Sequence, residues 1–240
     1  MFKKVTVALL LVCALVGVGA AQKKDKSWTE WSKKDAEKML KDSPWAQTQI
    51  ETDTSEMFFT PTARGGFNDP TRKDEGATNQ EVHLNYYVRF FSARPIRMAL
   101  ARLAVLNNVG NAQAAEGLKR FAEYQPTDIT IVTVWFDSTD QRTGGKVLQA
   151  LSSAETSTLK NDAYLERKDG KRIFLQEYVK PGKDGFGGRF IFPRNVDGKP
   201  FLLPDSGEVR FHAELGTNKE FKVDRRFKVA DMMYAGTLEY

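Results

Sequence analysis

The sequence predicts an α+β fold, with a helical N-terminal half packed on a mostly antiparallel β-sheet that is formed largely by the C-terminal half. Two observations lead to this prediction. Apolar residues recur at helical spacing in several segments before residue 161, whereas alternating apolar and polar residues, with two Asp-Gly turns, dominate after it. The expected segments are a signal peptide (1–21), an N-terminal amphipathic helix segment (22–45), a long polar loop (46–80) and a single α+β domain (81–240).

The first 21 residues have the layout of a secretory signal peptide. A short basic start precedes the apolar run Val5–Gly19, and Ala20 and Ala21 complete the small residues that a cleavage site needs. An uncleaved anchor is the alternative, but the run is shorter than the about 20 residues of a membrane span. We therefore expect export to a bacterial periplasm, the cell surface or the medium, with no transmembrane helix after signal cleavage.

Composition excludes several classes of function. The only cysteine, Cys13, lies in the apolar run, so the exported chain would have no disulfide, cysteine–metal site or cysteine nucleophile. The net charge of +5 falls to +3 once Lys3 and Lys4 are removed with the signal peptide. Because the two signs are interspersed, this balance does not indicate a protein that binds nucleic acid.

Three of the four tryptophans lie in one stretch, SWTEWSKKDAEKMLKDSPWAQ, which spans residues 27–47. Ser27 and Ser32 each begin a capping-box pattern, of which the second is the weaker. An apolar stripe at helical spacing follows Ser32, and Pro44 ends the predicted helix. The sequence therefore predicts a short amphipathic helix here.

Two interpretations of the tryptophans follow. As exposed aromatics, Trp28, Trp31 and Trp45 are candidate ligand contacts, for example in carbohydrate recognition. Alternatively, Trp31 and Trp45 bracket the helix and anchor it to the domain, since so short a helix is not stable alone. We favour anchoring, because aromatic residues beside an apolar helical stripe more often belong to a core.

The remaining elements alternate before residue 161 and are mainly strands after it. Asp169-Gly170 and Asp197-Gly198 predict hairpin turns in the second half. The predicted helices are 95–107, 112–124 and 146–160, and the main predicted strands are 82–90, 128–136, 208–215 and 221–229.

No catalytic residue, cofactor or metal site is predicted. The two histidines, His83 and His212, lie on the polar faces of alternating strands, where we expect exposed or partly exposed side chains, and they lack the spacing of a zinc motif. Acidic side chains leave a secreted hydrolase with paired carboxylates open as an alternative function, because such enzymes need only two acids that face one substrate. The candidate acids are Glu155, Asp162, Glu166 and Glu177.

The C-terminus supports a second alternative. Tyr240 ends the sequence, with Leu238 and Tyr234 at alternating positions before it, as in the insertion signal of outer-membrane β proteins. An outer-membrane-associated β protein is therefore the second alternative function. The helices before residue 161 and the charged positions between residues 222 and 228 favour a terminal strand of a water-soluble domain instead.

Several motifs together resemble a set of uncharacterised exported hypothetical proteins of acidobacterial type. These motifs are WTEWSKKDAEKMLKDSPWAQ, YYVRFFSARPIRMALARL, PDSGEVRFHAEL and FKVADMMYAGTLEY. The resemblance implies export and a bacterial envelope setting, and it implies no activity. The sequence thus predicts an exported envelope protein with a non-catalytic binding or structural role, whose partner is an envelope component, either protein or glycan, and no nucleic acid.

Overall fold

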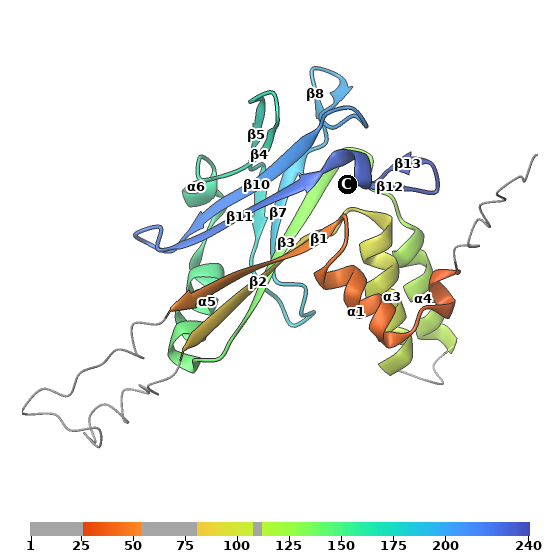
Figure 1. Cartoon of the computed structure of the whole chain (residues 1–240), viewed down its shortest axis with the longest axis horizontal. Coiled ribbons are helices and arrows are strands. Elements are labelled where there is room, and N and C mark those ends of the chain that lie inside the picture. Colours follow the sequence, from red (N-terminus) through yellow and green to blue (C-terminus); the bar gives the residue numbers. More distant parts are fainter. Residues whose placement is uncertain (1–25, 54–80, 108–111) are drawn as a thin grey trace, which may run out of the picture.

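A computed structural model describes residues 26–53, 81–107 and 112–240, which form two large antiparallel sheets, two short two-stranded sheets and a group of helices (Figure 1). The predicted signal peptide and residues 54–80 of the predicted polar loop lie outside the described residues. The first sheet has the order β1 (Ala46–Asp53), β2 (Val82–Phe90), β3 (Ile129–Ser138), β7 (Gly188–Pro193), β6 (Glu177–Val179). The second has the order β11 (Phe221–Lys228), β10 (Glu208–Leu215), β4 (Ala163–Arg167), β5 (Arg172–Phe174).

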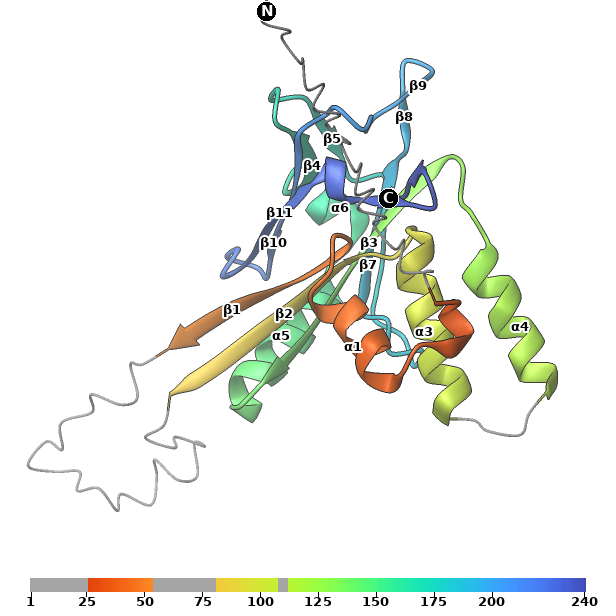
Figure 2. The ribbon, with the colours of Figure 1, turned by 45° about the vertical axis from the view of Figure 1, so that its right-hand side comes forward.

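The helices flank the sheets at two places. Helices α1 (Lys33–Lys41), α3 (Arg94–Asn107) and α4 (Ala112–Glu123) gather on one side, and α5 (Gln141–Ser153) lies near the opposite end of the strands (Figures 1 and 2). The short elements are η1 (Trp28–Glu30), α6 (Thr156–Leu159), η2 (Val229–Asp231), β8 (Asn195–Val196), β9 (Lys199–Pro200), β12 (Met233–Tyr234) and β13 (Thr237–Leu238). The described helices include none that is long and apolar enough to cross a membrane.

The core lies between the inner faces of the two sheets. Alternation along each strand sends every second side chain inward, and phenylalanines from the two sheets meet edge to face. Phe90 and Phe227 have ring centroids 4.9 Å apart at 89°, and Phe190 lies 5.2 Å from Phe211 at 76°. All four rings are fully buried, so this aromatic layer fixes the two sheets face to face.

Two glutamine side chains of β1 bridge the two sheets at one side of the core. The Gln47 Nε2 atom donates to the Arg226 carbonyl at 2.8 Å, and Gln49 Nε2 donates to the Lys222 carbonyl at 2.7 Å. The Gln49 Oε1 atom accepts from the Asp224 amide at 2.7 Å. These amides bond the free backbone edge of β11, so the edges of β1 and β11 are joined by side chains where a further strand would otherwise pair.

The N-terminal stretch folds around Ser32. Its side chain accepts from the Asp35 amide at 3.1 Å, and the Asp35 carboxylate accepts from the Ser32 amide, also at 3.1 Å, which completes a capping box for α1. The pattern at Ser27 makes no such cap, because its hydroxyl bonds the Thr29 hydroxyl at 2.8 Å. Only one turn of 3₁₀-helix, η1, forms there.

Two expectations need correction. Residues 46–53, expected to begin a polar loop, form β1, which pairs with β2, so that two strands of the first sheet come from the N-terminal half of the chain. The helix expected at 146–160 begins earlier, at Gln141, because the Asp140 side chain accepts from the Thr143 amide at 2.7 Å. It ends at Ser153, where the backbone of Ala154 is extended, and α6 follows as a separate short helix.

The C-terminal residues end in the core. Met233–Tyr234 and Thr237–Leu238 form a two-stranded hairpin, with Ala235 and Gly236 at positive φ of 49° and 80° in its turn. Tyr240 is buried, and the Arg194 guanidinium lies 3.8 Å from the centre of its ring. The fold is α+β, as predicted, with antiparallel sheets throughout the described residues.

Candidate functional site

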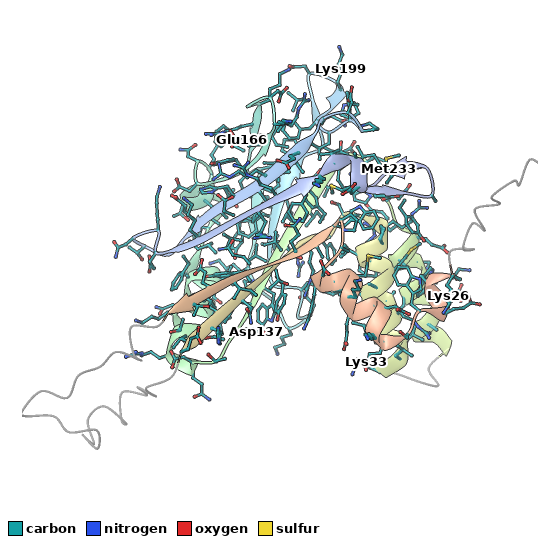
Figure 3. The ribbon with its side chains drawn as sticks, in the orientation of Figure 1. Lys26, Lys33, Asp137, Glu166, Lys199 and Met233 are labelled. Carbon is teal, nitrogen blue, oxygen red and sulfur yellow. The ribbon has the colours of Figure 1, made fainter. Side chains whose placement is uncertain are left out.

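The outer face of the four-stranded sheet carries rows of charged and aromatic side chains. The strand register places directly opposed residues side by side across β11, β10, β4 and β5. One row contains Arg226, Arg210, Glu166 and Arg172, and the next contains Asp224, His212, Tyr164 and Phe174. Figure 3 labels Glu166 on β4 of this sheet and, well apart from it in that view, Asp137 on β3 of the first sheet.

Arg210 lies at the centre of a hydrogen-bond network on this face. Its Nε atom lies 2.9 Å and 3.0 Å from the two carboxylate oxygens of Asp224, and its Nη2 atom also bonds that carboxylate. Its Nη1 atom lies 3.3 Å from Glu166 Oε2. The same Glu166 carboxylate accepts from Arg172 Nη2 at 3.0 Å. Four strands are thus connected by one chain of charge-assisted hydrogen bonds.

These contacts shift the pKa values of both members of the central pair. Hydrogen bonding to Asp224 raises the pKa of Arg210 above its ordinary value. Burial by itself would raise the pKa of Asp224, but hydrogen bonds from Arg210 and His212 outweigh it and hold that pKa below the ordinary value. The pair is therefore ionised at neutral pH.

His212 is buried, which corrects the expectation of an exposed or partly exposed side chain. It is 5% exposed because its ring stacks on Tyr164 with centroids 4.7 Å apart. The Nδ1 atom lies 3.0 Å from Asp224 Oδ2, and Nε2 lies 3.6 Å from Glu214 Oε1. In a Ser-His-Asp hydrolase the second ring nitrogen faces the nucleophile. Here it faces a second carboxylate, so the pair positions side chains and does not build a triad.

A hollow of about 270 Å³ opens beside the Arg210 network. Among the described residues, its Lys168 and Arg226 side chains have no hydrogen-bond or ion-pair partner, and Arg226 is exposed. The lining contains five basic and two acidic side chains, so the hollow presents an excess of positive charge. Its lining residues are Glu166, Arg167, Lys168, Gly170, Arg172, Glu208, Arg210 and Arg226.

None of the three candidate tryptophans lines this hollow. Trp45 is 5% exposed, and its Nε1–H donates to the Glu239 carbonyl at 2.8 Å. Trp28 is 8% exposed and packs on α3 and α4, with an edge lining a separate groove of about 380 Å³. Trp31 is half-buried between the two hydrophobic clusters. All three contact the helices or the core, and no flat aromatic platform is formed by them.

The four candidate acids do not meet in one cleft. Glu155 lies 3.7 Å from Lys180, and Asp162 lies 2.6 Å from Lys219. Glu166 belongs to the Arg210 network, and Glu177 is exposed on β6 of the other sheet. Two catalytic carboxylates have to face one substrate, and these four are held by separate cations or lie on separate sheets.

His83 is half-buried at the far end of β2, and the described residues contain no cluster of three or more metal-binding side chains.

Sequence reasoning named Glu166 only as a possible catalytic acid and passed over the arginines beside it. The Asp169-Gly170 turn was a usable signal, because the hairpin it predicts sets Glu166 opposite Arg172. The neighbours Arg210 and Asp224 come from strands more than 40 residues away in sequence from Glu166.

No family model matches the chain, and no curated protein and no solved structure matches it either.

Proposed function

We propose that the chain is an exported, non-catalytic binding protein of a bacterial envelope, and that the hollow beside Arg210 binds an anionic group of its ligand. Export is supported by the basic, apolar and small-residue layout of residues 1–21. A binding role is supported by the charged outer face, where the Arg210 network lies beside two exposed cations, Lys168 and Arg226, that lack partners among the described residues.

One observation carries the proposal. Arg210 and Arg226 stand directly opposite each other on neighbouring strands. Like charges in directly opposed positions destabilise a sheet, and the carboxylates of Asp224 and Glu166 bond Arg210 but not Arg226. An anion beside Arg226 would compensate its charge and receive paired N–H donors, the geometry in which arginine recognises carboxylate, sulfate or phosphate.

Proton-transfer chemistry has less support at this face. His212 and the carboxylates of Glu166 and Asp224 already bond one another or a cation, which holds each of them in place within the network. The arrangement is suited to holding an anion in place, and the rows of cross-strand bonds make the site rigid before the ligand arrives.

A titration of the purified ¹⁵N-labelled protein with sodium sulfate, followed by ¹H–¹⁵N NMR, tests this function. We expect saturable shifts of the Gly170, Arg210 and Arg226 amides. The double variant Lys168→Gln/Arg226→Gln should lose them, since it removes both unpartnered cations. Lys183→Gln, which removes an exposed lysine from the loop before β7, is the matched control and should keep them. Shifts that are unchanged in the double variant, or that spread evenly over the surface, would overturn the proposal.

A further inference from the structure

A second hollow adjoins the first on the same side of the molecule. Its volume is about 510 Å³, and Glu208 and Arg226 line both hollows. It is bounded by the C-terminal end of α1, the start of β1 and the end of β11, and its lining is completed by Lys38, Asp42, Ser43, Pro44, Gln47, Lys228 and Asp231. The two hollows together, which we name the long groove, lead from β5 across the second sheet to α1.

The length of the long groove exceeds one small ligand. Neighbouring strands lie about 4.8 Å apart, so Arg172 on β5 and Arg226 on β11 are separated by roughly 14 Å across three strand spacings. The second hollow then extends the groove from β11 to Lys38 on α1. A single monosaccharide or inorganic anion cannot occupy both ends, whereas a chain molecule can.

The charges along the long groove are mixed. Its lining contains seven basic and four acidic side chains. Lys38 and Lys228, like Lys168 and Arg226, have no side-chain partner among the described residues. The acidic side chains are Glu166, Glu208, Asp42 and Asp231.

This mixture distinguishes between kinds of polyanion. Duplex DNA carries one negative charge per about 1.7 Å, and so dense a charge would be repelled by the carboxylates that alternate with the cations. Carboxylates are acceptors of hydrogen bonds from hydroxyl groups, and arginine forks bind carboxylates in pairs of bonds. The groove therefore matches a ligand in which widely spaced carboxylates alternate with hydroxyl donors.

From these observations we infer that the long groove binds an acidic polysaccharide whose sugar rings carry carboxylates. This inference rests on the proposed function and specifies its ligand. One uronate carboxylate would lie between Arg210 and Arg226, a further one would reach Lys228 and Lys38, and ring hydroxyls would donate to Glu208 and Asp42.

Calorimetric titration of the purified protein with tetragalacturonate, galacturonate and fully methyl-esterified tetragalacturonate tests the ligand class. Because several weak contacts are joined in one chain, we expect the tetramer to bind about 100-fold more tightly than the monomer. The esterified tetramer keeps the shape and hydroxyls but loses the charges, and it should bind no better than the monomer. Equal affinity for tetramer and monomer, or tighter binding of poly-glutamate or polyphosphate than of the tetramer, would overturn the inference.

Variants in the second hollow separate this inference from the proposed function. Lys38→Gln/Lys228→Gln should weaken tetragalacturonate binding about fivefold or more, as expected for losing exposed charge contacts, and leave the sulfate-induced shifts of Arg210 intact. Lys183→Gln should change neither. If sulfate still binds but the second-hollow variant leaves tetramer affinity unchanged, the extended ligand is wrong and the anion site remains. If sulfate binding is also absent, the proposed function itself fails.

Discussion

Gln49 on β1 and Asp224 on β11 hold the two sheets together at the edge nearest the candidate site. The Gln49 side-chain oxygen accepts from the Asp224 amide at 2.7 Å, while its nitrogen donates to the Lys222 carbonyl at 2.7 Å. The Asp224 carboxylate in turn bonds Arg210 and His212. Gln49 therefore joins the two sheets at the edge of the core. It also fixes the backbone of Asp224, the residue that orients Arg210.

We expect Gln49→Ala to lower the free energy of unfolding by about 1–3 kcal/mol, because it leaves a partly buried amide and a carbonyl without partners. Urea unfolding followed by circular dichroism measures the change. The matched control is Ile50→Thr, at the neighbouring exposed position on the opposite face of β1, which should change stability by no more than about 0.5 kcal/mol. Equal effects of the two variants would show that the glutamine bonds do not join the sheets.

The Arg210–Asp224 pair makes stability depend on pH in the acid range. The folded-state pKa of Asp224 is depressed, so the pair contributes stability above the unfolded-state pKa of about 3.9 and loses it as pH falls through the folded value. Arg210→Met keeps the aliphatic stem but removes the charge. The difference in unfolding free energy between the wild type and this variant should therefore shrink from about pH 5 to about pH 2.

Urea unfolding at a series of pH values measures this difference. Arg172→Met, which removes the more exposed partner of Glu166, serves as the control and should have a smaller effect at neutral pH. A difference for Arg210→Met that stays constant over the whole pH range would contradict the assigned ion pair.

Tyr87 gives a second, alkaline pH dependence. Burial first, and then the hydrogen bond to Asp137 and its charge, raise the pKa of Tyr87 to about 12. Stability from this group is complete below the unfolded-state pKa of about 10 and is lost as pH rises through about 12. Asp137→Asn should lower the pKa of Tyr87 without returning it to 10, since burial remains. NMR titration of the tyrosine ring carbons measures the value, and an unchanged pKa would exclude the contact with Asp137.

Trp45→Phe tests whether the tryptophans anchor the N-terminal stretch. It removes the donor to the buried Glu239 carbonyl, so we expect a loss of about 1–3 kcal/mol in unfolding free energy. Trp31→Phe should cost less, because the Trp31 ring is half-buried and its Nε1–H bonds an exposed carbonyl of Lys26. Chemical unfolding of both variants provides the comparison. A smaller loss for Trp45→Phe than for Trp31→Phe would contradict the anchoring role.

Strands could be predicted from the sequence where apolar and polar side chains alternate regularly. The strand expected at 208–215 has those bounds as β10, because its inward residues are all apolar. β1 was missed for the opposite reason. Its inward positions carry Gln47 and Gln49, whose amides are needed for bonds to β11, so no apolar alternation appears in the sequence.

The candidate site was harder to predict than the elements that build it. The hairpin turn at Asp169-Gly170 brings Glu166 and Arg172 together, which sequence alone can indicate. The pairing of β4 with β10, which brings Arg210 to Glu166, joins segments 44 residues apart. Long-range strand pairing depends on the whole core, and a single sequence gives no local signal for it.

The most direct test of the central claim is a map of where an acidic oligosaccharide binds. Tetragalacturonate added to the ¹⁵N-labelled protein should shift amides in a continuous path. The path should run from Gly170 and Arg172 through Glu208 and Arg226 to Asp42 at the end of α1. We expect these amides to shift together, with the same dependence on ligand concentration. Saturable shifts centred elsewhere, for example around Trp28 and Arg102 in the groove between α3 and α4, or no shifts at all, would contradict it.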